Sequence, residues 1–507
     1  MKTKILLLIA AYLSILPASK GQTIKLDELD STAKKLMVDF DLPGLAVGIV
    51  RNDSILFAKG YGVREINKDL PVNTNTIFGI GSISKSFTAL TLGILVSQGK
   101  INWDDRVKDF LPYFELYDPY VTVNFTIRDL LTHRSRLNWT SGGTLWYHSD
   151  LSRTDVIKGL KYLKPISGFR DKPAYQNVMY LVAGEIVKEV SGMTWDEFLK
   201  VNVFNKIKMK NSTSVSSERE VNANIARPHI WNDNFERIAI EQEKGDNLAP
   251  AGFVYSSVSD MMNYMKLLLN DGIFEKDTVV SKDIIDEIFK PQIIFPMFPP
   301  PIHNEFTSYG FGWWITPGNG HKIIDHSGGI DGMSANLVMI KDLNIGIIVL
   351  TNTDELAPLV LTLKLLEQVF NDKSYDLYAS FKGYRDYLLT QEKSNKEKLG
   401  KPQISGTKPS LDLKLYAGTY NDKMYGDIIV KYKDGNLEID FSHTPLFKAK
   451  LKHWHYDTFI VDWYDPRVSD GFITFNFNEK KEITGITLDQ QNLLDVDFSE
   501  LEIKKEN

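Results

Sequence analysis

Strand-like apolar runs occur in two groups that lie far apart in the chain, and this separation limits the folds open to it. The first group, "GLAVGIVRNDSILFAKGYG" (44–62), has two apolar runs about an Asn52-Asp53 turn, the pattern of a β-hairpin. The second group lies within residues 321–352 and comprises "HKIIDHS", "SANLVMI" and "IGIIVLTN". The segments "GGIDGM" and "KDLN" separate these runs, which predicts an antiparallel meander.

Helical periods dominate the sequence between the two groups, from about residue 84 to residue 240. Examples are "TIRDLLTH", "RTDVIKGLKYL" and "NVMYLVAGEIVKEVSG". Strands on both sides of a helical region predict an α+β domain in which one antiparallel sheet, built from the hairpin and the meander, is flanked by helices. We assign residues 22–372 to this domain.

The rest of the chain predicts a linker and a second domain. The segment 373–409 begins with a charged helical pattern, "DYLLTQEKSNKEKLGK", and ends in turn formers, "PQISGTKPS", so we read it as a helical, charged linker. From residue 410 to residue 507 short strands alternate with turns, as in "GDIIVKYKDGNLEIDF". This pattern predicts a separate all-β domain resembling a small barrel.

The first 21 residues have the features of a secretory signal peptide: two lysines close to the start, a short apolar run and small residues before a cut between Gly21 and Gln22. We therefore expect a secreted or periplasmic protein. An uncleaved anchor is the alternative, but the apolar run is short for a membrane span, and no stable span is expected after cleavage. The chain has no cysteine, which excludes disulfides and thiol catalysis, and its net charge of −6 is spread evenly, which argues against a nucleic-acid partner.

A serine and a lysine one helical turn apart provide the first candidate for chemistry. The Ser-x-x-Lys pattern occurs at Ser31/Lys34, Ser82/Lys85 and Ser405/Lys408. The first match lies in an ordinary surface helix and the third in turn formers, whereas Ser82 stands between an extended run and an apolar helix whose core face we assign to Phe87, Leu90, Ile94 and Leu95. A helix N-terminus favours a serine alkoxide and disfavours a protonated lysine, and burial lowers a lysine pKa further. Ser82 is therefore the candidate nucleophile and Lys85 its base.

Two further segments offer the other groups that such a pair needs. "DKPAYQNVMYLV" contains Tyr175 and Asn177, the only Tyr-x-Asn in the chain; a packing tyrosine and a helix-capping asparagine are the plainer interpretation. "IIDHSGGIDG" places His326, Ser327 and two glycines at a strand end, where a substrate can approach the backbone and an amide can face an oxyanion. A glycine-rich hairpin with an isolated histidine is the alternative there.

In this order the three elements resemble the serine β-lactamase and penicillin-binding-protein superfamily, in particular its class C β-lactamase, D-aminopeptidase and esterase branch. The similarity extends to "TIRDLLTHRS", "PAGFVYSSVSDMMNYM" and "YGFGWW". The segment from residue 411 is similar to the lipocalin-like domain that follows such domains. The resemblance implies that Ser82 is acylated, that Lys85 is its base and that Tyr175 moves protons to the leaving group and water. It also implies substrate binding by Asn177, His326, Ser327 and Gly328, and an oxyanion hole formed by the amides of Ser82 and Gly329.

The sequence departs from this pattern at two positions. His326-Ser327-Gly328 stands where β-lactamases and penicillin-binding proteins have Lys-Thr-Gly, and a histidine of ordinary pKa is mostly uncharged at neutral pH. A fixed cation for a substrate carboxylate is therefore missing, which favours a peptidase or an esterase over a β-lactamase. Arg136 in "THRSRL" stands where relatives commonly have glycine.

The sequence thus predicts an exported serine hydrolase that forms an acyl-enzyme on small peptides or amides, with D-amino-acid-containing peptides as one class. A carboxylesterase and a β-lactamase are alternatives of the same fold, and a non-catalytic penicillin- or peptide-binding protein is a further one. No cofactor is expected. His453 and His455 in "HWH" lack a nearby carboxylate, so no metal site is expected there either. The sequence does not indicate an oligomeric state.

Overall fold

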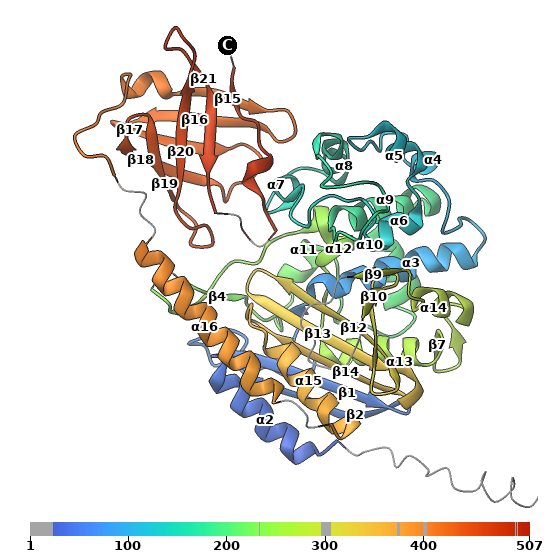
Figure 1. Ribbon diagram of the computed structural model, residues 1–507. Helices are drawn as coiled ribbons and strands as arrows, with labels where there is room; N and C mark the ends of the chain where they lie inside the picture. The colour runs from blue at the N-terminus through green and yellow to red at the C-terminus, as the bar shows by residue number, and fades with distance from the viewer. Residues whose placement is uncertain are drawn as a thin grey trace, which may run out of the picture.

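The computed structural model describes residues 24–232, 234–295, 306–372, 376–398, 403–491, 493 and 495–506. The expected signal peptide lies outside these residues. Figure 1 shows a larger α+β part, built from the N-terminal three quarters of the chain, and a separate barrel at the C-terminal end. Within the described residues, no helix is both long and apolar enough to span a bilayer.

An eight-stranded sheet forms the centre of the α+β part. In spatial order its strands are β2 (Ser54–Gly62), β1 (Gly44–Arg51), β14 (Ile345–Thr351), β13 (Met333–Ile340), β12 (His321–Ile330), β11 (Trp314–Gly318), β10 (Thr307–Tyr309) and β9 (Ile293–Phe295). Neighbouring strands are antiparallel, and β1 pairs with β14 so that Val47 faces Val349. This pairing joins the predicted hairpin and meander in one sheet, which confirms the α+β fold class.

One face of the sheet is covered by helices from the two ends of the α+β part. These helices are α2 (Leu26–Asp39) and α15 (Ala357–Phe370), and their apolar side chains pack against β1 and β14. Every residue of β14, and every residue of β1 except Arg51, is buried because helices cover both faces here. This explains why these strands are continuous apolar runs rather than alternating ones.

The opposite face carries the helices that surround the site, chiefly α3 (Ser84–Ser97), α9 (Val178–Ser191) and α13 (Val258–Leu269). The four residues that we assigned to the core face of α3 are buried, but burial extends around the whole helix, because every residue from Ser84 to Leu95 is buried. The polar residues on its other sides are hydrogen-bonded inside the protein: Thr88 Oγ1 donates to the Pro250 carbonyl at 2.6 Å, and Tyr264 donates to Ser86 Oγ at 3.0 Å. α3 is therefore a central helix.

Short helices complete this part of the molecule. They are α4 (Val107–Phe110), α5 (Pro119–Asn124), α6 (Ile127–Leu131), α7 (Gly143–Trp146), α8 (Arg153–Gly159), α10 (Trp195–Leu199), α11 (Ser216–Glu220), α12 (Ala249–Gly252) and α14 (Lys282–Ile288). Capping boxes begin three of them, at Thr126, Ser152 and Thr194.

The C-terminal part is a closed antiparallel barrel, as the strand pattern predicted. The long helix α16 (Leu377–Lys398) leads towards it along α15 and α2 (Figure 1). The barrel strands are β15 (Gly418–Asp422), β16 (Gly426–Lys433), β17 (Asn436–Phe441), β18 (Lys448–His455), β19 (Thr458–Trp463), β20 (Gly471–Phe477), β21 (Ile483–Asp489) and β22 (Lys504–Lys505). Aromatic rings such as Tyr416, Phe459 and Phe475 pack inside it. A lipocalin-like relationship stays a prediction.

Candidate active site

Ser82 lies in a tight turn between the sheet and the central helix. The turn is η1 (Gly81–Ile83), a single 3₁₀ turn that leads directly into α3. Gly81 has φ +54°, and a Cβ on it would lie 2.3 Å from the Gly329 amide nitrogen. A Cβ on Gly328 would lie 1.9 Å from the Ile80 carbonyl oxygen. Only glycines allow strand β12 to lie against the backbone of this turn, which brings the Ser82 and Gly329 backbones to the same place.

The Lys85 amine is buried directly behind Ser82. Its Nζ donates to Ser82 Oγ at 3.0 Å, to Asn177 Oδ1 at 2.7 Å and to the Ala251 carbonyl oxygen at 2.9 Å. Burial lowers the pKa of Lys85 to about 7, while the carboxylate of Asp495 opposes this shift. At neutral pH a large fraction of Lys85 is therefore the free amine, which is the form that can accept a proton from Ser82.

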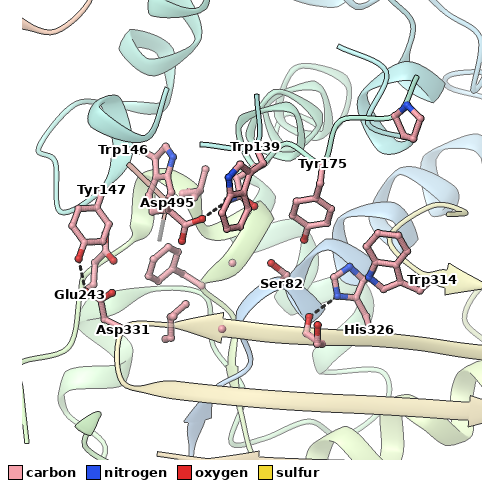
Figure 2. A pocket seen from close by; sticks show the side chains of 18 of the residues that line it. Ser82, Trp139, Trp146, Tyr147, Tyr175, Glu243, Trp314, His326, Asp331 and Asp495 are labelled. Atoms are coloured by element: carbon pink, nitrogen blue, oxygen red, sulfur yellow. Dashed lines mark hydrogen bonds between the residues drawn. The ribbon is translucent and has the colours of Figure 1, made fainter. Parts of the chain in front are cut away.

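Tyr175 points at Ser82 from the other side of the pocket, as Figure 2 shows. Its ring centroid lies 4.8 Å from Lys85 Nζ, and its ring stacks on Trp314 with the centroids 6.2 Å apart. Burial raises the pKa of Tyr175 above its usual value, and the interaction with the Ser82 side chain partly opposes this. Tyr175 is therefore protonated and can donate a hydrogen bond or a proton.

Asn177 occupies the N-cap position of α9 but does not cap the helix with its side chain. Instead its Oδ1 accepts from Lys85, and its Nδ2 donates to Asp495 Oδ1 at 3.3 Å. The plainer interpretation of this asparagine as a helix cap is therefore wrong. Its amide links the buried base to a residue from the far end of the chain.

His326 is buried, with 1 % of its surface exposed, and both ring nitrogens are engaged. Nδ1 donates to the Ser327 carbonyl oxygen at 2.6 Å, so Nε2 accepts from the Tyr309 hydroxyl at 2.9 Å. Burial lowers the pKa of His326 to about 3, and the neighbouring Lys85 amine acts in the same direction. The side chain is neutral throughout the physiological pH range and does not replace the charge of a lysine.

A cavity of about 530 Å³ opens in front of Ser82 (Figure 2). Aromatic side chains surround one end of it: Trp139, Tyr175, Phe295 and Trp314. Three carboxylates lie towards the other end, Glu243, Asp331 and Asp495, together with the aromatic rings of Trp146, Tyr147 and Phe253. None of the described residues that line the cavity is a lysine or an arginine. A small molecule with an apolar group fits this lining, and a free substrate carboxylate finds no cation in it.

Asp495 is a lining residue that the sequence did not reveal. It belongs to the C-terminal part, in the connection between β21 and β22, and reaches the cavity beside α7. The backbones meet closely, since a Cβ on Gly143 would lie 1.8 Å from the Asp495 carbonyl oxygen. Glu500 from the same segment accepts a hydrogen bond from the Gly142 amide at 2.8 Å. No motif marks Asp495, because its role depends on how the barrel docks on the α+β part.

A charged cluster at the carboxylate end also joins the two parts of the molecule. Asp331 Oδ2 accepts from the Tyr147 hydroxyl at 2.8 Å and lies 3.2 Å from His148 Nε2, and Glu243 Oε2 lies 3.6 Å from the same nitrogen. These donor atoms are close enough to hold a metal ion. Arg467 of the barrel, however, places Nη1 3.1 Å from His148 Nε2 and 3.7 Å from Asp331 Oδ2. We read the cluster as an ion-pair contact between domains.

The two other Ser-x-x-Lys matches lie on the surface, as expected from their sequence context. Ser31 and Lys34 are exposed on α2, where Lys34 pairs with Asp30 at 2.8 Å. Ser405 and Lys408 are exposed in irregular backbone before the barrel. Neither lysine is buried against its serine, in contrast to Lys85.

The fold and the serine–lysine site define a serine hydrolase of the β-lactamase and penicillin-binding-protein type. The chain belongs to the family described as Beta-lactamase, whose model matches residues 29–368. Residues 402–506 match a domain of unknown function, DUF3471. The match confirms the family that the three motifs indicated.

Curated relatives and solved structures agree with this assignment. The chain is 24% identical over 429 residues to the unguisins hydrolase ungD of Aspergillus violaceofuscus, covering 78% of this chain and 75% of that one. It is 29% identical over 324 residues to penicillin-binding protein 4* of Bacillus subtilis, covering 59% of this chain and 66% of that one. The fold is similar to the octameric penicillin-binding protein homologue from Pyrococcus abyssi, with a TM-score of 0.62, 21% identity and coverage of 95% and 100% of the two chains.

Proposed function

We propose that the protein is an exported serine hydrolase that forms an acyl-enzyme on Ser82 and cleaves amide bonds in small peptides, including peptides that contain D-amino acids. The observation that carries the proposal is the buried Lys85 amine, 3.0 Å from Ser82 Oγ and with a pKa of about 7. A lysine held in this way is a base at neutral pH. A relative described as an unguisins hydrolase supports hydrolysis as the type of reaction.

In the proposed reaction Ser82 Oγ attacks the substrate carbonyl carbon while Lys85 takes its proton. The backbone amides of Ser82 and Gly329 donate to the oxyanion that forms on the former carbonyl oxygen. Tyr175 gives its proton to the leaving nitrogen and regains one from the Lys85 ammonium, because its raised pKa does not allow it to remain ionised. A water molecule then attacks the acyl carbon; its proton moves to Tyr175 as Tyr175 passes its own proton to the neutral Lys85 amine. The Lys85 ammonium then protonates Ser82 Oγ as the ester bond breaks, which releases the acid and restores the free serine.

Two observations support the order in which we propose the alternative activities. The described cavity lining carries carboxylates and no lysine or arginine, and His326 is neutral, so a substrate that binds through its own carboxylate is disfavoured. This places β-lactamase activity behind peptidase and esterase activity. An esterase uses the same groups and is the second candidate. A silent binding protein would not require a lysine held as a free amine next to a serine.

Covalent labelling tests the proposal directly. A fluorophosphonate probe should label the wild-type protein and Ser31→Ala, whose serine has the same spacing to a lysine, but not Ser82→Ala. Absence of label on the wild type, or label retained in Ser82→Ala, would overturn the assignment. Turnover of D- and L-aminoacyl amides against p-nitrophenyl esters then separates the peptidase from the esterase, and the N-terminus of the protein recovered outside the cytoplasm tests export.

A further inference from the structure

We propose that Asp495, supplied by the C-terminal domain, is a positioning residue for the Ser82–Lys85 pair: through Asn177 it orients the base and stabilises the positive charge that Lys85 gains. The inference rests on the proposed function, since it concerns the proton transfer from Ser82 to Lys85. It assigns a chemical role to a domain that a family description leaves without a function. The barrel would then complete the catalytic site.

The orientation of the Asn177 amide is the first observation. Its oxygen accepts from Lys85 Nζ at 2.7 Å, and its nitrogen donates to Asp495 Oδ1 at 3.3 Å. A flipped amide would turn its NH₂ group towards the lysine and its oxygen towards a carboxylate, which are two unfavourable contacts. Asp495 therefore selects the orientation in which Asn177 holds the lysine amine in line with Ser82.

The position of Asp495 is itself fixed from both sides. Its backbone lies directly against Gly143 of α7, where no side chain larger than hydrogen fits. The next residue, Val496, is fully buried, and Phe498 packs on Phe447 of the barrel with the ring centroids 5.1 Å apart. The carboxylate is thus held between the two domains and is partly open to the cavity. Because its position is already fixed, no loop has to be ordered when a substrate binds.

The charges around Lys85 leave this role to Asp495. The polar and aromatic groups that act on the amine are Ser82, His133, Tyr175, Asn177, Tyr180, His326 and Asp495. Burial keeps both histidines neutral, because it lowers their pKa values, and burial keeps both tyrosines protonated. Asp495 is the one anion of this set. Among the described residues no arginine, and no lysine other than Lys85, acts on Asp495, although Asp331 repels it.

The proton transfer makes use of this arrangement. When Oγ bonds to the carbonyl carbon, the Ser82 proton moves to Nζ, so Lys85 changes from a neutral amine to an ammonium ion in a buried site. The Asp495 carboxylate, polarising Asn177 between them, stabilises that ion. Burial raises the pKa of Asp495 to about 6, so the charged form that has this role is the main form at pH 7 and above. A third group that orients and stabilises a base in this way has the role that the aspartate has for histidine in a Ser-His-Asp triad.

The pH dependence of acylation distinguishes this role from a purely structural one. Removing the negative charge in Asp495→Asn, which keeps an acceptor for Asn177, makes Lys85 a weaker base. The acid limb of the acylation rate should therefore move to lower pH, while the plateau at alkaline pH falls roughly tenfold. Asp495→Glu restores the charge and should return the limb towards the wild-type position. Loss of packing alone would lower the rate at every pH and leave the limb in place.

We would measure second-order acylation by a neutral ester from pH 5 to pH 9, together with the melting temperature. Asp497→Asn is the matched control, because Asp497 lies in the same segment and its side chain accepts from the backbone N–H and the hydroxyl of Ser499, at 2.9 Å and 2.6 Å; its profile should match the wild type. An acid limb that stays in place in Asp495→Asn, or that moves equally in Asp497→Asn, overturns the inference. Failure of the proposed function would appear separately, as absence of acylation of Ser82 in the wild type.

Discussion

The guanidinium of Arg136 donates from Nη1 to the carbonyl oxygen of Lys172 at 2.9 Å, three residues before Tyr175. A second contact reaches the Pro173 carbonyl at 3.3 Å, and Nε donates to Ser167. Arg136 is buried and has φ +61°, a left-handed conformation that glycine adopts more readily. The resemblance leads us to expect glycine at this position. The arginine adopts a strained backbone conformation here, and its side chain fixes the segment that carries Tyr175.

Replacing Arg136 separates these two effects. Arg136→Gly relieves the strain but releases the segment before Tyr175, so turnover should fall by roughly 10- to 100-fold, since small misplacements of a catalytic group have effects of this size. Arg136→Ala loses the contacts and keeps the strain, so its melting temperature should lie below that of Arg136→Gly. Steady-state rates and calorimetry on both variants check this. Unchanged turnover in Arg136→Gly would show that the segment holds its place without the arginine.

Lys85 and Tyr175 should act on a single proton path. Lys85→Ala and Tyr175→Phe should each lower turnover by roughly 10²- to 10⁴-fold, the usual effect of removing one general acid–base group. In the double variant the losses should not multiply, because either deletion already interrupts the path. Burst kinetics with an ester separate acylation from deacylation. Multiplicative losses would contradict a shared path, and near-normal activity in Lys85→Ala would place the base elsewhere.

His326 gives a prediction about substrate charge. Because its pKa is about 3, the ratio of acylation by a penicillin to acylation by a neutral ester should not rise between pH 8 and pH 5 in the wild type. His326→Lys introduces the missing cation, and a contact of roughly 1–3 kcal/mol should raise that ratio by about one to two powers of ten. A ratio that is the same in both proteins would show that this position does not face the substrate carboxylate.

The sequence was sufficient for the parts of the molecule that local patterns determine. Continuous apolar runs identified β1 and β14, and the Ser82/Lys85 spacing with an apolar helix behind it identified a serine and a buried lysine that are in contact. Each of these signals is contained in one short segment of the chain, so it can be recognised without knowledge of the rest of the fold. Asn177 was found because it lies two residues from Tyr175, although its partner was not.

Residues whose surroundings come from distant segments could not be predicted from local patterns. Asp495 is more than three hundred residues from Asn177, and it enters the site only because the barrel docks against Gly142 and Gly143. The sequence around Asp331 indicates only a turn. Its partners, Tyr147 and His148, lie in a distant segment, so its contacts could not be predicted. A single sequence carries no signal for such contacts, because they depend on the packing of whole domains.

Removing the barrel should leave a folded but impaired protein. A chain ending at Ser405 keeps the complete eight-stranded sheet and the helices on both faces, so it should melt cooperatively. It loses Asp495 and uncovers the surface around Gly143, so its acylation rate should fall at least as far as that of Asp495→Asn and its melting temperature should drop. Calorimetry and acylation by a neutral ester check this. Wild-type acylation by the shortened chain would show that the barrel does not contribute to the site.

The folded protein should lose stability as pH rises through the titration of Glu243 and His148. Burial raises the pKa of Glu243 to about 7, and His148 opposes this shift only in part. Burial alone would lower the pKa of His148, but the carboxylates of Glu243 and Asp331 outweigh it, so the pKa of His148 is raised. Both groups therefore bind protons more tightly in the folded protein, so the stability they contribute is present at pH 5 and lost as pH rises through 7. The loss is on the order of 1–3 kcal/mol for Glu243.

Glu243→Gln tests this, because the amide keeps an acceptor for the His148 backbone N–H, which donates to Glu243 Oε1 at 2.7 Å, while the titrating group is removed. The melting temperature of the wild type should fall between pH 5 and pH 8, and the fall should be shallower in Glu243→Gln. Glu241→Gln is the matched control, since Glu241 is exposed and pairs only with Arg227 on the surface, so its slope should match the wild type. Parallel slopes in Glu243→Gln and the wild type would show that Glu243 does not couple protonation to folding.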